Sequence, residues 1–112
     1  MAMPTLIGPK DLTRDVVDEE FPRKTAGAYV IGTRDLDQVM RVPYAGRSDD
    51  DIANRLKVHI GNYEAFSYVV ADSPKQAFEL HCEIYHALMP SKNTRHPYKP
   101  AGVDCICPVC GK

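Results

Sequence analysis

Two short apolar segments and the helix that follows them, within residues 27–60, constrain the fold more than any other part of the chain. Residues 28–32 form a β-branched and aromatic run typical of a buried strand, and residues 38–44 alternate apolar and polar side chains. The polar residues 33–37 between them favour a turn. The pattern therefore predicts a β-hairpin, with Pro43 marking the end or an edge of its second strand.

Two helices and a third strand are expected after this hairpin. Ser48 is a good N-cap, and the three aspartates after it suit the positive end of a helix dipole. An apolar stripe at helical spacing follows at Ile52, Ala53, Leu56 and Ile60. Residues 63–71 predict a third strand, and Ser73-Pro74 predicts a second helix that ends near Leu88. We expect an α+β fold, with a three-stranded antiparallel sheet flanked by helices.

Composition narrows the class of protein. A chain of 112 residues makes one domain with a modest core, near the size at which a bound metal often helps. The net charge of −1 gives no basic excess, so contact with DNA would have to come from a local patch. The chain holds no apolar run of membrane-spanning length and no signal peptide pattern at its start. We expect no membrane partner, a cytoplasmic location and reduced cysteines.

Three regions are expected along the chain. Residues 1–26 mix charges, prolines and few apolar anchors, which is typical of an N-terminal arm with a short strand or helical turn at the domain edge. Residues 27–90 form the core. Residues 91–112 are polar and carry Pro97 and Pro100, which predicts a loop and a cysteine-rich tail packed on the second helix.

A set of polar residues recurs in a recognisable order within the core. Gly27-Ala28-Tyr29 lies on the first strand, Tyr44-Ala45-Gly46 ends the second, Arg55 follows nine residues after Gly46, and His59 lies one turn beyond. This arrangement resembles the GIY-YIG nuclease family over roughly residues 27–88. The resemblance implies a hairpin, helix, strand, helix core and a nuclease acting on DNA. It also implies that the scissile phosphate is surrounded by Tyr29, Tyr44, Arg55 and His59.

These residue types suit phosphodiester cleavage. In the family, one tyrosine or a water that it positions attacks the phosphorus, and the arginine stabilises the phosphate charge. A tyrosine has a pKa of about 10, so it acts as a base only beside a cation or metal. Arg55 offers a planar fork that matches phosphate. The alternative is that both tyrosines are amphipathic core residues and that Arg55 and His59 lie on a solvated helix face.

The second helix departs from the family pattern at His81. The resemblance implies a carboxylate there that holds a divalent metal, Mg²⁺ or Mn²⁺, whereas this sequence has a histidine. Glu79 and Glu83 lie on the opposite side of the helix and cannot replace it. Imidazole is a poorer ligand for a hard cation. Three interpretations remain: a ligand for a softer metal, a degenerate site, or a buried histidine satisfied by a hydrogen bond.

The cysteines predict a structural zinc site. Residues 107–111, Cys-Pro-Val-Cys-Gly, have the spacing of a zinc knuckle. Cys82 and His86 lie four apart on the second helix and can supply the other two ligands. The predicted ligands are Cys82, His86, Cys107 and Cys110, with His96 and Cys105 as substitutes. Such a closed site would clamp the tail onto the helix without being catalytic. Disulfides are the less expected alternative.

Two functions follow from these observations. The first is a GIY-YIG-like, metal-dependent endonuclease acting on DNA phosphodiester bonds, with activity weakened or altered because His81 occupies the carboxylate position. The alternative is a catalytically inactive GIY-YIG-fold module, stabilised by zinc, that binds nucleic acid or another protein.

Overall fold

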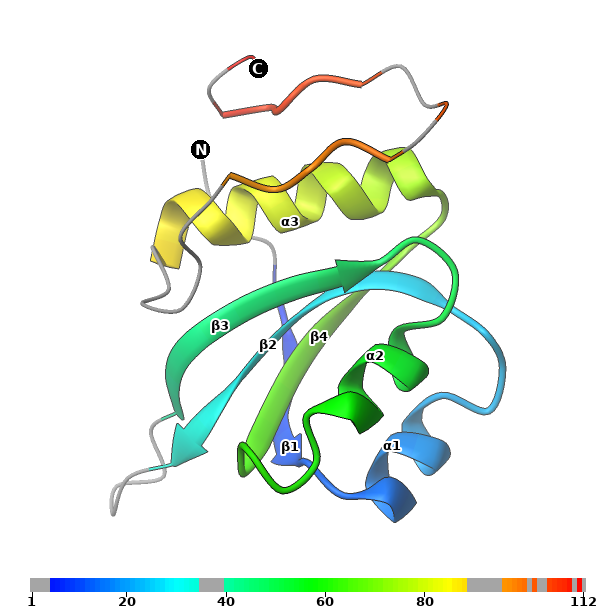
Figure 1. The fold of residues 1–112 in the computed structure, drawn as a ribbon, viewed down its shortest axis with the longest axis vertical. Coiled ribbons are helices and arrows are strands. Elements are labelled where there is room, and N and C mark those ends of the chain that lie inside the picture. Colours follow the sequence, from blue (N-terminus) through cyan, green and yellow to red (C-terminus); the bar gives the residue numbers. More distant parts are fainter. Residues whose placement is uncertain are drawn as a thin grey trace.

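The computed structural model describes residues 5–34, 40–88, 96–100, 102, 105–109 and 111, with side chains for all but 34 and 40–43. Figure 1 shows α3 on one face of a sheet, α1 and α2 on the other, and the tail beyond α3. The elements are β1 (Ile7–Asp11), α1 (Arg14–Glu20), β2 (Ala26–Arg34), β3 (Met40–Ser48), α2 (Ile52–Val58), β4 (Ala65–Ala71) and α3 (Pro74–Leu88).

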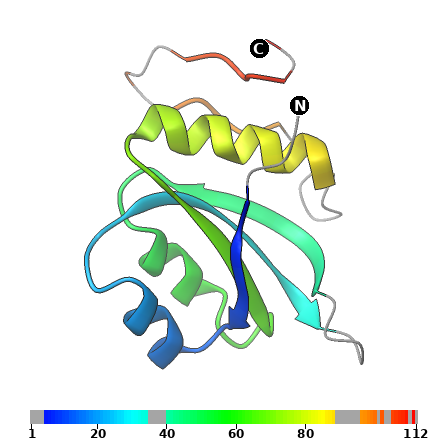
Figure 2. The ribbon, with the colours of Figure 1, turned by 180° about the vertical axis from the view of Figure 1, so that it is seen from behind.

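The sheet is antiparallel with strand order β1-β4-β2-β3, which confirms the α+β class. Strands β2 and β3 form the predicted hairpin, with Tyr29 opposite Gly46 and Ile31 opposite Tyr44. The sheet has four strands, so the prediction of three was incomplete. Strand β1 adds the fourth by pairing with β4, and Figure 2 shows the two side by side from behind.

The segment expected to be an arm contributes to the domain. Helix α1 is capped by the Thr13 hydroxyl, which accepts from the Val16 amide at 3.3 Å. Leu12, Val17 and Phe21 are buried in the main core cluster. The strand signal was weak because β1 is short, contains Gly8-Pro9, and shifts register between Ile7 and Lys10.

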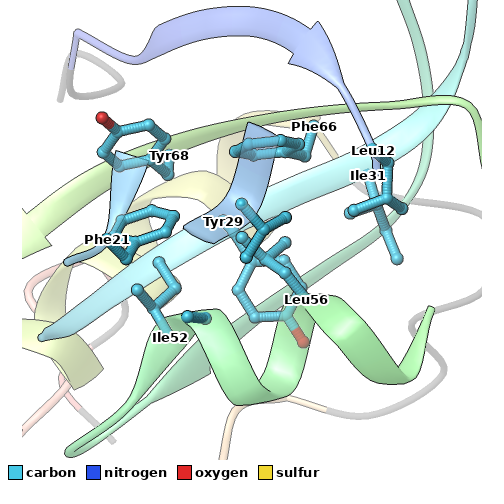
Figure 3. Close-up of a cluster of buried hydrophobic side chains, with 10 residues drawn as sticks. Leu12, Phe21, Tyr29, Ile31, Ile52, Leu56, Phe66 and Tyr68 are labelled. Atoms are coloured by element: carbon cyan, nitrogen blue, oxygen red, sulfur yellow. The ribbon is translucent and has the colours of Figure 1, made fainter. Parts of the chain in front are cut away.

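The alternation of side chains along β2 divides the core between the two faces of the sheet. Tyr29 and Ile31 point to the α1/α2 face, where they pack with Phe66 and Leu56 as Figure 3 shows. The other face is covered by α3, and its cluster is Ala28, Val30, Ala45 and Ile84. Successive residues of β3 therefore alternate between the two faces of the sheet, so that neighbouring residues of this strand contribute to opposite faces.

The ends of the helices follow local hydrogen bonds. The Gln76 amide donates to the Ser73 hydroxyl at 3.1 Å, which confirms the predicted start of α3. Helix α2 begins later than expected, because Asp51 is its N-cap while Ser48 accepts from the Asp51 amide at 2.8 Å. None of the helices that the structure describes has the length and apolar content that crossing a membrane requires.

Candidate functional site

A cavity of about 770 Å³ lies at the β3 edge of the sheet, where the two faces meet. One side, which we name the tyrosine wall, consists of Tyr29, Tyr44 and Arg55. A second part of the lining, the tail wall, is residues 96–98 of the tail. Arg47 and His81 line the cavity from the α3 side of the sheet. The structure thus brings four of the predicted site residues to one cavity, namely Tyr29, Tyr44, Arg55 and His81.

Gly46 allows the Tyr29 hydroxyl to reach the cavity. Tyr29 is only 2% exposed and belongs to the core cluster, so its ring must cross the partner strand to reach the rim. A Cβ atom on Gly46 would lie 2.6 Å from the Tyr29 Oη and 2.7 Å from its Cζ, closer than such atoms approach. Position 46 therefore has to lack a side chain for this tyrosine to line the cavity.

The two tyrosines differ in their surroundings. Burial raises the pKa of Tyr29, and the neighbouring Tyr44 raises it further, which outweighs the lowering effect of the Arg55 charge. Tyr29 therefore stays protonated near neutral pH and can donate a hydrogen bond to an anion. Tyr44 is half-buried, and its ring centroid lies 6.4 Å from that of Tyr29. Tyr44 is the more accessible hydroxyl for a reaction in the cavity.

His59 supports the tyrosine wall from behind. It is the C-cap of α2, and its ring centroid lies 5.4 Å from Tyr44, 6.2 Å from Tyr29 and 5.9 Å from Tyr63. Burial, and after it the charge of Arg55, lower the pKa of His59, so the neutral imidazole is favoured. The two residues of the predicted pair thus differ in position. Arg55 lines the cavity, whereas His59 packs against the tyrosine rings.

Arg47 ties the tail wall to β3 and α3, a role that its positive charge alone does not predict. Its Nε donates to Asp49 Oδ1 at 3.0 Å, its Nη1 lies 3.3 Å from Nδ1 of His81, and its Nη2 donates to the backbone carbonyl of Tyr98. The guanidinium carbon lies 5.3 Å from the centroid of the Phe78 ring. A side chain only 11% exposed thus ties β3 to α3 and the tail wall.

His81 is a buried, hydrogen-bonded histidine. It is 9% exposed, and because a guanidinium can only donate, Nδ1 accepts from Arg47 and the ring is neutral. Burial, and after it the Arg47 charge, lower the pKa of His81 to about 3. The hydrogen bond at Nδ1 favours the last of the three interpretations, but the buried Nε2 of His81 has no hydrogen-bond partner among the described residues. A neutral imidazole against a guanidinium does not fit the Mg²⁺ or Mn²⁺ that the family resemblance implies at this position.

A second site lies where the tail meets α3. The ligand atoms of Cys82, His96 and Cys107 all lie within 4.8 Å of one another, close enough to hold one metal ion. His96, expected only as a substitute, therefore takes the place predicted for His86 in this cluster. His86 lies beside it, with its ring centroid 5.2 Å from that of His96. Cys110, the other predicted ligand, lies outside the described residues.

The donor set of this cluster suits a soft or borderline metal. His96 Nδ1 lies 3.0 Å from the Pro97 carbonyl, which can only accept, so Nδ1 carries the proton and Nε2 is the ring nitrogen able to bind a metal. The amide of Gly111 donates to the Cys107 carbonyl at 2.9 Å, with Gly111 at φ +77°, which closes a turn between these two residues. The buried Cys105 packs beside Cys82 and Cys107.

Comparisons with known proteins identify no relative of this chain. No family model, curated protein or solved structure matches the chain. The function therefore has to be argued from the two sites themselves.

Proposed function

We propose that this protein is a GIY-YIG-like endonuclease scaffold that binds and cleaves DNA phosphodiester bonds at the cavity. The observation that supports this proposal is the convergence of Tyr29, Tyr44 and Arg55 on one cavity. Their order along the chain led us to expect this convergence, and two core tyrosines with a solvated arginine would not require it.

The chemistry assigns one task to each side chain. Arg55 binds the non-bridging phosphate oxygens and stabilises the negative charge that builds up on them. Tyr29 donates a hydrogen bond to the same group, because burial keeps it protonated. Tyr44 orients a water that attacks the phosphorus, or attacks it directly to form a phosphotyrosyl ester that a water then hydrolyses, and the proton of the attacking hydroxyl passes to solvent. The bond to the leaving oxygen breaks as the new phosphorus–oxygen bond forms, and the leaving oxygen takes a proton from water.

Nicking of supercoiled plasmid tests this proposal. Tyr44→Phe should reduce the rate by about 10²-fold or more, since it removes the attacking or positioning hydroxyl. Arg55→Ala should reduce it by about 10²-fold or more, since the developing charge loses its partner. Tyr68→Phe and Arg23→Ala are the matched controls, because both residues lie outside the cavity lining. Nicking that survives Tyr44→Phe and Arg55→Ala unchanged would refute the proposal.

A second function is favoured by the pair of Arg47 and His81. Their contact places a positive charge where the family keeps a metal-binding carboxylate, so the cavity suits binding of a phosphate better than cleavage. The scaffold would then be a nucleic-acid-binding module. His81→Glu, alone and combined with Arg47→Gln, discriminates between the two functions, assayed with Mg²⁺ and Mn²⁺. Nicking that is absent in the wild type and gained by the double variant identifies the binding module.

We also propose that Cys82, His96 and Cys107 hold a structural zinc ion, with Cys110 as the fourth ligand that the Cys-Pro-Val-Cys spacing supplies. Four protein ligands leave no open position, so the ion would stabilise the tail rather than take part in the reaction. Elemental analysis of the purified protein should give one zinc per chain. Cys107→Ser should lose the metal, and Cys105→Ser should retain it. Retention by Cys107→Ser would exclude this ligand set.

A further inference from the structure

We propose that Tyr98 is a base-stacking platform, so that the cavity takes a phosphate whose neighbouring base is unpaired. This inference rests on the proposed function, since it concerns the same cavity. It narrows the substrate class to single-stranded DNA, or to a strand opened at the point of contact.

The backbone that carries Tyr98 is fixed on both sides. Its carbonyl accepts from Nη2 of Arg47, and two residues earlier His96 belongs to the cluster with Cys82 and Cys107. Pro97 between them is buried. The backbone that carries Tyr98 is therefore positioned before any ligand binds, which reduces the backbone entropy lost on stacking.

The ring itself faces outward. Tyr98 is 67% exposed although it lines the cavity, whereas Tyr29 on the tyrosine wall is 2% exposed. A large aromatic side chain held open at the mouth of a cavity offers a π-face to a flat ligand. Bases stack on such faces in proteins that bind single strands, and they do so with little dependence on sequence.

The dimensions of the cavity agree with this assignment. Its volume of about 770 Å³ lies in the range of pockets that take whole small ligands and exceeds the needs of a single phosphate. Asp49 and Asp50 also line it, and each is already engaged, with Arg47 at 3.0 Å and with Ser48 at 3.2 Å. Because the chain carries a net charge of −1, stacking would supply affinity that bulk charge does not.

A duplex does not offer the same contact. Its bases stack on one another, and only an unpaired base can place its face on a protein side chain. A phosphate bound by Arg55 on the tyrosine wall leaves the tail wall to the adjoining nucleotide. The platform would therefore bind a single strand more tightly than a duplex, because a duplex must first break a base pair to stack a base on Tyr98.

Fluorescence anisotropy with labelled single-stranded and duplex oligonucleotides tests the inference. The buffer contains no added Mg²⁺ or Mn²⁺ and no chelator, so that cleavage is not supported and the zinc content stays unchanged. Tyr98→Ala should weaken binding of the single strand by roughly tenfold or more, as loss of one base–aromatic stack does. Tyr98→Phe should stay within about twofold of wild type, since the ring remains. Ile106→Ala is the control, because Ile106 is also exposed on the tail, at 59%, but lies outside the cavity lining.

A second readout reports the stack itself. A 2-aminopurine base in the single strand should lose fluorescence on binding to wild type and to Tyr98→Phe, and retain it on binding to Tyr98→Ala. If Arg55→Ala weakens binding while Tyr98→Ala does not, the platform is refuted and the phosphate site stands. If neither variant affects binding, the proposed function fails as well. Equal binding of single strand and duplex by the wild type would also refute the platform.

Discussion

The two walls of the cavity are built in different ways. The tyrosine wall grows out of the hydrophobic core, where the β2–β3 register sets Tyr29 against Gly46 and α2 supplies Arg55. The tail wall has almost no core of its own. Residues 96–98 are held by the Arg47 guanidinium and by the cluster around Cys82.

Because of this difference, the two walls should differ in how easily they open. A wall made of buried side chains lasts as long as the fold, because it moves only when the sheet unfolds. A wall held by a few polar contacts can separate while the sheet remains intact. The tyrosine wall therefore depends on packing, whereas the tail wall depends on the cluster of Cys82, His96 and Cys107 and on one arginine.

Removal of the metal should separate the walls most clearly. A metal that binds only the folded chain at a thousand times its Kd stabilises it by about 4 kcal/mol, and chelation or Cys107→Ser should remove that contribution. Amide exchange should accelerate in the described tail and the C-terminal half of α3, while β2 and β4 keep their protection. Simultaneous loss of protection in β2 would show that the two walls do not differ.

Gly46→Ala should damage the tyrosine wall alone. The new methyl group would meet the Tyr29 ring at 2.6–2.7 Å, and overpacking of this kind costs about 1–3 kcal/mol. Thermal or urea unfolding measures the loss. In a Tyr29→Ala background the same change should cost little further, because the ring is gone. Metal content should stay at the wild-type level in every one of these variants.

Arg47→Lys should loosen the tail wall to a smaller extent. Lysine keeps the charge but lacks the fork that reaches Asp49, His81 and the Tyr98 carbonyl together. We expect a loss of about 1.5 kcal/mol, typical of a hydrogen bond with a charged group. Faster exchange or proteolysis confined to the tail is the measurement. Unchanged protection in Arg47→Lys would show that the metal cluster alone holds this wall.

The contact of Glu20 with Lys10 and Tyr68 should give the smallest effect. The hydrogen bond from Lys10, and after it the one from Tyr68, lower the pKa of Glu20. Its stabilisation is therefore present above the ordinary glutamate pKa and is lost as the pH falls through the lowered value. Lys10→Met should flatten this part of the pH–stability curve by at most about 1 kcal/mol. Both walls should be unaffected, since the contact lies outside the cavity lining.

Sequence reasoning placed the tyrosine wall and missed much of the tail wall for a physical reason. Tyr29, Tyr44 and Arg55 were grouped because their order along the chain resembles the GIY-YIG pattern, and they lie on a hairpin and a helix whose regular periods fix which side chains share a face. His96 lies in an irregular segment, where no period relates it to Cys82. The helical spacing of His86 was therefore preferred for the ligand, although the tail brings His96 closer.

Arg47 and Tyr98 illustrate the same limit. An arginine on an edge strand resembles any solvated cation, and its burial depends on a carbonyl 51 residues away. One signal was present in the sequence: Arg47 alternates with Gly46, so it must point to the α3 face, toward His81. Strand β1 was underestimated because Gly8-Pro9 interrupts its pattern, and only pairing with β4 identifies it as a strand.

The proximity of His96 and Tyr98 has a thermodynamic consequence. The metal cluster and the Arg47 hydrogen bond act on a segment of three residues, so each raises the local concentration of the other's partner. Thermodynamic reciprocity then requires equal factors. If a bound metal strengthens the equilibrium constant of the Arg47–Tyr98 contact by some factor, that contact raises the affinity for the metal by the same factor. If the cluster holds the proposed ion, a residue on the sheet that binds no metal would thereby tune how tightly the chain retains it.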